Sequence, residues 1–164
     1  MLKYVPRMTS VVMEEIPGRV SLAVEISQCR GTCRGCHSPF LREDIGEPLT
    51  EEVIDFLIKD NFGINCFLFL GEGREPQELI PLCRHIKETF GIEVALYSGR
   101  EEVEDSLMAE FDYVKVGPYI PEMGPLNKRT TNQRLYKVER KDGELSLEDI
   151  TSLFWRRGID PNVK

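Results

Sequence analysis

One strand-length segment of the chain is apolar throughout, "INCFLFL" at residues 64–70. A strand with one face in water alternates apolar and polar side chains, so a continuous apolar run indicates a strand covered on both faces. Such strands are typical of parallel sheets, in which helical crossovers join neighbouring strands. This segment therefore favours an α/β fold.

Strand-like and helix-like segments alternate around this run. Thr50 is expected to cap the first helix, in which Val53, Phe56 and Leu57 share a face. The alternation predicts an α/β fold, a partial (β/α) barrel of about five to six units with a mostly parallel sheet. The other strands are predicted at residues 19–26, 92–98, 112–117 and 134–140, and helices at 50–60, 75–90, 101–111 and 146–158.

Length and charge limit the organisation and the partners. The 164 residues fit one domain, 1–164, in which residues 140–164 form a C-terminal extension. The net charge of -7, without a long basic run, argues against a nucleic-acid partner. The N-terminus lacks a signal-peptide pattern, and no apolar run approaches the roughly 20 residues that span a bilayer. We therefore expect a cytoplasmic protein without a membrane partner.

Three of the five cysteines, Cys29, Cys33 and Cys36, lie close together directly after the first predicted strand. An odd number of cysteines with three crowded together does not indicate a disulfide framework, and this spacing favours a metal site. In α/β sheets, ligands bind at the carboxyl ends of strands, which is where this cluster falls. Cys66 and Cys83 lie inside an apolar strand and a helix, so both are expected to be buried.

Several metals suit three thiolates. Structural zinc requires a fourth protein ligand, and His37 directly follows Cys36, but no second pair of ligands lies downstream. Catalytic zinc with three protein ligands and a water stays open as an alternative. An iron–sulfur cluster is held by thiolates, and with three of them one iron keeps an open coordination position.

The spacing Cys29-x3-Cys33-x2-Cys36 after a strand resembles the signature of the radical S-adenosylmethionine superfamily. Within it, residues 11–138 resemble the anaerobic ribonucleoside-triphosphate reductase activating proteins, through "RVSLAVEISQCRGTCRGCHSP", "FLGEG", "VALYSG" and "VGPYI…TTNQRLYKV". The resemblance implies a [4Fe–4S] cluster, S-adenosyl-L-methionine at the open iron, and its reductive cleavage to a 5′-deoxyadenosyl radical.

The resemblance also implies what this radical does. It implies an oxidoreductase that generates a glycyl radical on anaerobic ribonucleotide reductase, a large protein partner. A small electron-donor protein such as a flavodoxin would be the second partner. No catalytic residue beyond the cluster is implied, because homolytic hydrogen abstraction needs no general base.

Site residues follow from the same resemblance. Cys29, Cys33 and Cys36 would ligate the cluster. Gly71 and Glu72 resemble a Gly-Gly-Glu segment whose backbone meets the methionine amine, although Leu70 stands in place of the first glycine. Ser98 ends a strand at a position from which a polar group reaches the ribose. The residues that the resemblance implies for cofactor binding are Gly35, Cys36, His37, Gly71, Glu72 and Ser98.

Two other functions stay open on the sequence alone. A radical S-adenosylmethionine enzyme of this kind can act on another protein or on a small molecule. A zinc-binding interaction module without enzymatic activity also fits three cysteines and a histidine. The other histidine, His85, lies in a charged helical segment and is expected at the surface.

Overall fold

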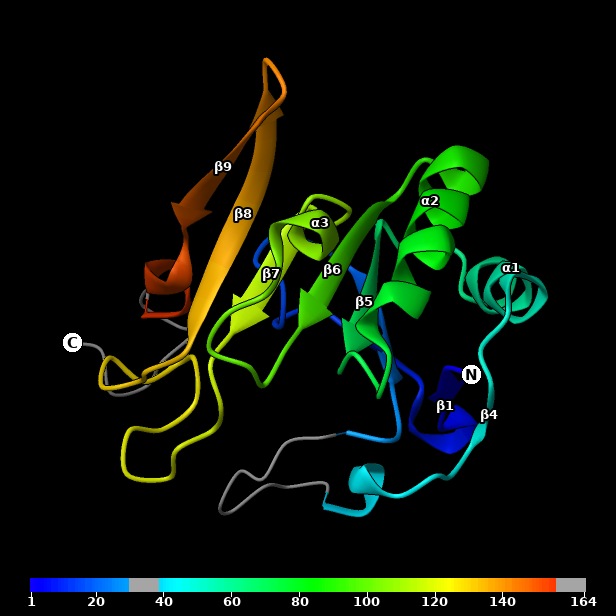
Figure 1. The fold of residues 1–164 in the computed structure, drawn as a ribbon, viewed down its shortest axis with the longest axis horizontal. Helices are drawn as coiled ribbons and strands as arrows, with labels where there is room; N and C mark the ends of the chain where they lie inside the picture. Colours follow the sequence, from blue (N-terminus) through cyan, green and yellow to red (C-terminus); the bar gives the residue numbers. More distant parts are fainter. Residues whose placement is uncertain (30–38, 156–164) are drawn as a thin grey trace.

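A seven-stranded sheet forms the centre of the molecule, in the order β2-β3-β5-β6-β7-β8-β9 (Figure 1). We analysed a computed structural model of the chain, which describes residues 1–29 and 39–155. A separate two-stranded sheet pairs β1 (Lys3–Tyr4) with β4 (Glu47–Pro48). The strands of the large sheet are β2 (Ser10–Val12), β3 (Ser21–Glu25), β5 (Cys66–Leu70), β6 (Glu93–Tyr97), β7 (Tyr113–Val116), β8 (Arg134–Lys141) and β9 (Glu144–Asp149).

The fold is mixed α/β, and the prediction of a mostly parallel sheet is wrong. Strands β3, β5, β6 and β7 are parallel, but β2 pairs antiparallel with β3, β8 with β7, and β9 with β8. The physical reason lies after Val116, where the turn-rich segment 117–133 contains no crossover helix. The chain therefore returns antiparallel, and the described residues do not show a barrel.

Helices α1 (Glu51–Asp60), α2 (Leu79–Phe90) and α3 (Asp105–Met108) make the crossovers between the parallel strands. The Thr50 hydroxyl accepts a hydrogen bond from the Val53 N–H, as predicted. The predicted apolar face of α1 is partly wrong, because Ile54 and Ile58 are buried whereas Phe56 is 65% exposed. Helix α2 begins later than predicted, because Pro76 opens the short 3-10 helix η3 (Pro76–Glu78) instead.

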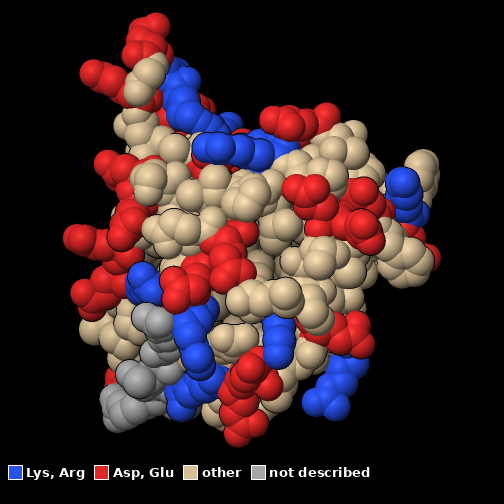
Figure 2. All heavy atoms as spheres, turned by 45° about the vertical axis from the view of Figure 1, so that its right-hand side comes forward, with Lys and Arg blue, Asp and Glu red and all other residues tan. Residues whose placement is uncertain are grey.

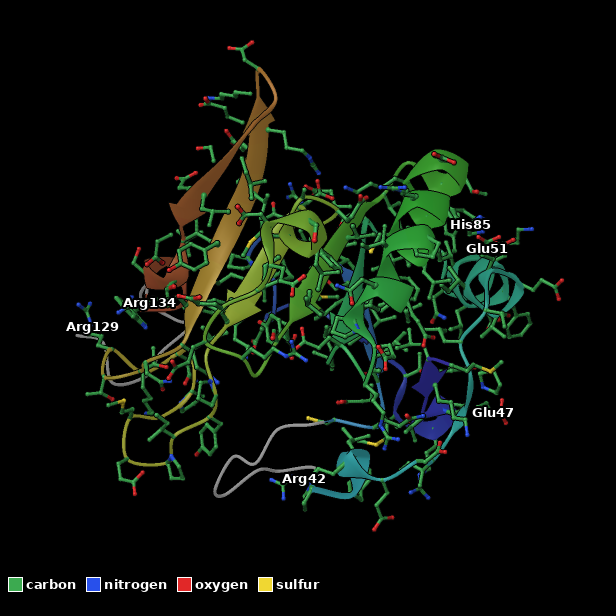
Figure 3. All side chains as sticks on the ribbon, in the orientation of Figure 1. Arg42, Glu47, Glu51, His85, Arg129 and Arg134 are labelled. Atoms are coloured by element: carbon green, nitrogen blue, oxygen red, sulfur yellow. The ribbon has the colours of Figure 1, made fainter. Side chains whose placement is uncertain are left out.

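His85 links two of the helices. Its Nε2 atom lies 2.6 Å from Asp55 Oδ1, and its Nδ1 lies 3.7 Å from Glu51 Oε2. Figure 3 shows His85 on α2 beside Glu51 at the start of α1. The side chain is only 20% exposed, so the histidine holds α2 against α1 and is less exposed than expected.

The predicted C-terminal helix at 146–158 is wrong over its described part. Residues from Glu144 form β9, and the short 3-10 helix η4 (Thr151–Trp155) follows it. Asp142 and Gly143 have φ angles of 52° and 79°, which are the positive values that a tight hairpin turn requires. This turn folds β9 back onto β8, so β9, which the sequence did not predict, takes the edge position of the sheet.

The two faces of the large sheet are covered differently. The face that we call the helix face packs against the three helices, and its core includes Val24, Phe69 and Leu96. The opposite face, the loop face, packs under two loops and the short 3-10 helix η4, which contribute Ile16, Leu126 and Phe154. Strand β5 is buried on both faces, as predicted from its apolar run.

The surface adds two observations. On the face shown in Figure 2, acidic side chains lie among basic ones and no continuous basic surface is present. Within the described part of the chain, no helix combines the length and the apolar character needed to cross a bilayer.

The carboxyl ends of β3, β5, β6 and β7 meet at one edge of the sheet, the lower edge in Figure 1, where ligands bind in α/β folds.

Candidate functional site

The cysteine segment begins at this carboxyl edge. Cys29 follows β3 and is exposed, and its backbone N–H donates to the Leu41 carbonyl at 2.8 Å. The N–H of Gln28 donates to the Glu43 carbonyl at 3.1 Å, so the start of the segment is tied to the residues that follow it. The other predicted site residues here lie outside the described residues, and their roles stay predictions: Cys33, Gly35, Cys36 and His37.

The two remaining cysteines are buried, as predicted. Cys66 and Cys83 are both fully inaccessible to solvent. Burial raises the pKa of Cys66 to about 12 and raises the pKa of Cys83 even more. Cys66 is the first residue of β5, at the opposite end of that strand from the carboxyl edge, and Cys83 is buried within α2, so neither thiol lies beside Cys29.

Gly71 and Glu72 follow β5, the parallel neighbour of β3. Gly71 has a φ angle of 108°, which favours glycine, and its N–H donates to the Tyr97 carbonyl at 3.0 Å. Among the described residues, we find no donor bonded to the carbonyl of Gly71 or of Glu72. Two carbonyl oxygens with spare acceptor capacity suit an ammonium group, so this segment fits the predicted contact with the methionine amine.

The structure brings Glu72 and Ser98 together, but on the helix face. The Ser98 hydroxyl donates to Glu72 Oε1 at 2.8 Å and accepts from the Arg100 N–H at 3.1 Å. Arg100 Nε lies 3.0 Å from the same carboxylate oxygen. A cavity of about 50 Å³ borders this network and is also lined by Val103 and Leu107 of the helix-face core. The hydroxyl proton of Ser98 is therefore already donated, and the predicted ribose contact stays a prediction.

Sequence reasoning missed a polar row on the loop face. The sheet register aligns Glu25, Leu70 and Tyr97, the last residues of β3, β5 and β6, with Lys115, the last but one of β7, so their side chains share one face. Lys115 is 7% exposed, and its Nζ atom donates to the Gly117 carbonyl at 3.2 Å and lies 5.5 Å from the centre of the Tyr97 ring. The signal that could have identified this row is a polar side chain near the end of three predicted strands, namely Glu25, Tyr97 and Lys115.

The two outer members of this row carry opposite charge, but they are three strands apart. Strand spacing of about 4.8 Å separates Glu25 from Lys115 by roughly 14 Å, too far for an ion pair. No described residue forms a hydrogen bond or ion pair with the Glu25 carboxylate, and its burial raises its pKa. The Tyr97 hydroxyl donates to the Glu15 carbonyl, and burial raises the Tyr97 pKa well above its usual value. Three of the four residues of this row thus place polar groups on the loop face at the carboxyl edge of the sheet.

No cluster of at least three His, Cys, Asp or Glu side chains suited to a metal ion occurs within 1–29 and 39–155. Of the three predicted cysteine ligands only Cys29 lies within the described residues, so the predicted metal centre stays a prediction. Comparisons of the chain with protein-family models, with curated proteins and with solved structures found no match. The functional assignment accordingly depends on the cysteine motif and on the geometry around it.

Proposed function

We propose that this protein is a radical S-adenosylmethionine enzyme that generates a glycyl radical on anaerobic ribonucleoside-triphosphate reductase. One observation carries the proposal: Cys29, the first cysteine of Cys-x3-Cys-x2-Cys, is exposed and follows β3, and the Gly71–Glu72 segment follows β5, the adjacent parallel strand, at the same edge of the sheet. The four parallel strands with their crossovers would correspond to part of a (β/α) barrel, whose interior would be the loop face.

Each part of the chain has a role in this proposal. The thiolates of Cys29, Cys33 and Cys36 would hold the cluster, which when bound supplies the electron for cleavage of S-adenosyl-L-methionine. The carbonyls of Gly71 and Glu72 would accept hydrogen bonds from the ammonium of the cofactor. The covered loop face would exclude water from the reaction. Gly35 and His37 would lie beside the cluster, where a histidine orients its neighbours through hydrogen bonds.

The proposed partners follow from the resemblance of residues 116–138 to the closing segment of the activating proteins. A large glycyl-radical reductase would be the substrate, and a flavodoxin-like protein would donate the electron. A cytoplasmic location would keep the three thiols reduced.

Electron paramagnetic resonance tests the substrate assignment. The reconstituted protein is mixed anaerobically with an anaerobic ribonucleotide reductase, S-adenosyl-L-methionine and dithionite. We expect a glycyl-radical signal that is absent when Cys29→Ala replaces the wild type and present with Cys83→Ala. Cleavage of the cofactor without any radical on the reductase would instead favour another substrate, and the absence of both would contradict the proposed function.

A further inference from the structure

A second pocket lies at the carboxyl ends of β3 and β5, between the N-terminal segment and the loop after Gly71. Its volume is about 210 Å³, and it is separate from both the Glu72–Ser98 network and the loop-face row. Gly73 closes one side, because a Cβ atom there would lie 2.9 Å from Leu2 Cδ1. The polar residues that line the pocket are Lys3, Ser27, Gln28, Arg74, Glu75 and Glu78.

Three of these side chains are already held in place. Lys3 Nζ and Gln28 Nε2 both donate to Asp44 Oδ1, at 2.7 Å and 3.1 Å. Glu78 Oε2 accepts from the Leu2 N–H at 2.6 Å. Gln28 has a φ angle of 61°, a conformation that a residue other than glycine rarely adopts and that is enriched at ligand sites. The walls of the pocket are therefore fixed before any ligand arrives.

The other three polar side chains have capacity to spare. Ser27 is 1% exposed, and its buried hydroxyl has no hydrogen-bond partner within the described structure. A buried hydroxyl without a partner is costly, so its presence beside a pocket points to a ligand atom. Arg74 and Glu75 are exposed, and neither forms a side-chain hydrogen bond or ion pair with a described residue. Besides Lys3, Glu78 and the Met1 ammonium, which have partners, the pocket thus offers one cation and one anion without an ion-pair partner among the described residues, and one hydroxyl.

We propose that this pocket binds a zwitterion of amino-acid size. The ligand carboxylate would pair with the Arg74 guanidinium, its ammonium with the Glu75 carboxylate, and the Ser27 hydroxyl would bond a ligand oxygen. A simple anion would leave Glu75 without a partner, and a simple cation would leave Arg74 without one. A volume of about 210 Å³ is enough for a small amino acid.

The proposal does not depend on the proposed radical chemistry. Ser27 and Gln28 directly precede Cys29, and Arg74 follows the Gly71–Gly73 segment, so an occupied pocket would stabilise both segments at the carboxyl edge. A ligand that binds only the folded chain also raises its melting temperature.

Calorimetric titration of the full chain tests the pocket. The probes are L-serine, L-glutamine and L-leucine. Acetate carries only the carboxylate charge of an amino acid and methylammonium only its ammonium charge, and these two halves of the zwitterion are titrated at matched ionic strength. We expect at least one amino acid to bind and to raise the melting temperature, and both halves to bind at least tenfold more weakly. Failure of all three amino acids to bind, or acetate binding as tightly as the best of them, would overturn the proposal.

Matched variants locate the site. Arg74→Gln and Glu75→Gln each remove one charge from an exposed position, and we expect each to weaken amino-acid binding at least tenfold. Arg140→Gln removes an exposed arginine from β8, away from the pocket, and should bind like the wild type. Unchanged affinity in both pocket variants would show that the ligand binds elsewhere and would refute the assignment.

Discussion

At the scale of single residues, burial decides which cysteines are chemically available. Cys29 is exposed at the end of β3, whereas Cys66 and Cys83 are packed within the core. Desolvation disfavours the charged thiolate, which is both the nucleophile and the metal ligand. The sequence predicted this division correctly, because an apolar strand and an amphipathic helix bury their small residues.

Alkylation of the native, metal-free protein with iodoacetamide at pH 8 tests this division. With a pKa of about 12, Cys66 has a thiolate fraction of about one in ten thousand at that pH. We expect rapid labelling of Cys29 and almost none of Cys66 or Cys83, as measured by mass spectrometry of peptides. Urea should make all of them reactive, and equal labelling of Cys66 and Cys29 before unfolding would contradict this expectation.

Glu25 gives a pH dependence with a definite sign. Burial raises its pKa in the folded state, so the protonated form is favoured by folding and the charged form is disfavoured. We expect Glu25→Gln to increase the free energy of unfolding at pH 7, and to lose this advantage as the pH falls below the usual carboxyl pKa. Urea unfolding at pH 4 and pH 7 measures both values. A variant less stable than the wild type at pH 7 would indicate a favourable partner for this carboxylate.

Ser98 tests the buried network on the helix face. Ser98→Ala removes one hydrogen bond to Glu72 and one from the Arg100 N–H, and we expect a loss of about 1–2 kcal/mol in the free energy of unfolding. Ser106→Ala, an exposed change in α3, should stay within about 0.5 kcal/mol of the wild type. Equal effects of the two changes would mean that the network contributes nothing to stability. A separate rise in the KM for S-adenosyl-L-methionine would support the predicted ribose contact.

At the scale of elements, the sequence predicted segments better than it predicted their ends and partners. Thr50 and the apolar run 64–70 identified α1 and β5, because a cap and a continuous apolar stretch are local signals. The sequence wrongly predicted a helix at 146–158, because Leu153, Phe154 and Trp155 are equally suited to a helix and to a segment that packs on the face of a sheet. The Asp142–Gly143 turn reverses the chain, so the residues after it pair with β8 as strand β9 and do not form a helix.

Helix α1 supplies a matched pair of core and surface substitutions. Ile54 is fully buried whereas Phe56, two residues later, is 65% exposed. We expect Ile54→Ala to cost about 2–5 kcal/mol in the free energy of unfolding and Phe56→Ala less than about 0.5 kcal/mol. Urea denaturation of both variants measures the difference. A larger loss at Phe56 would mean that this ring packs inward, as the sequence pattern suggested.

At the scale of the whole molecule, the register of the sheet decides which face each site residue takes. The sequence placed Glu72 and Ser98 at the correct edge, since both follow the ends of parallel strands, β5 and β6. It could not assign a face, because a shift of one residue moves a side chain to the other side of the sheet. The structure consequently turns Glu72 and Ser98 toward the helices, while Tyr97 and Lys115 face the loop side.

The central claim is that Cys29, Cys33 and Cys36 hold a cluster that cleaves S-adenosyl-L-methionine. Its most direct test measures bound iron and 5′-deoxyadenosine after anaerobic reconstitution with iron and sulfide, then addition of cofactor and dithionite. We expect about four irons per chain and steady product formation in the wild type and in Cys83→Ala. Cys29→Ala should lose at least nine-tenths of the product. A chain that binds zinc and no iron, or that holds four irons and yields no 5′-deoxyadenosine, would contradict the claim.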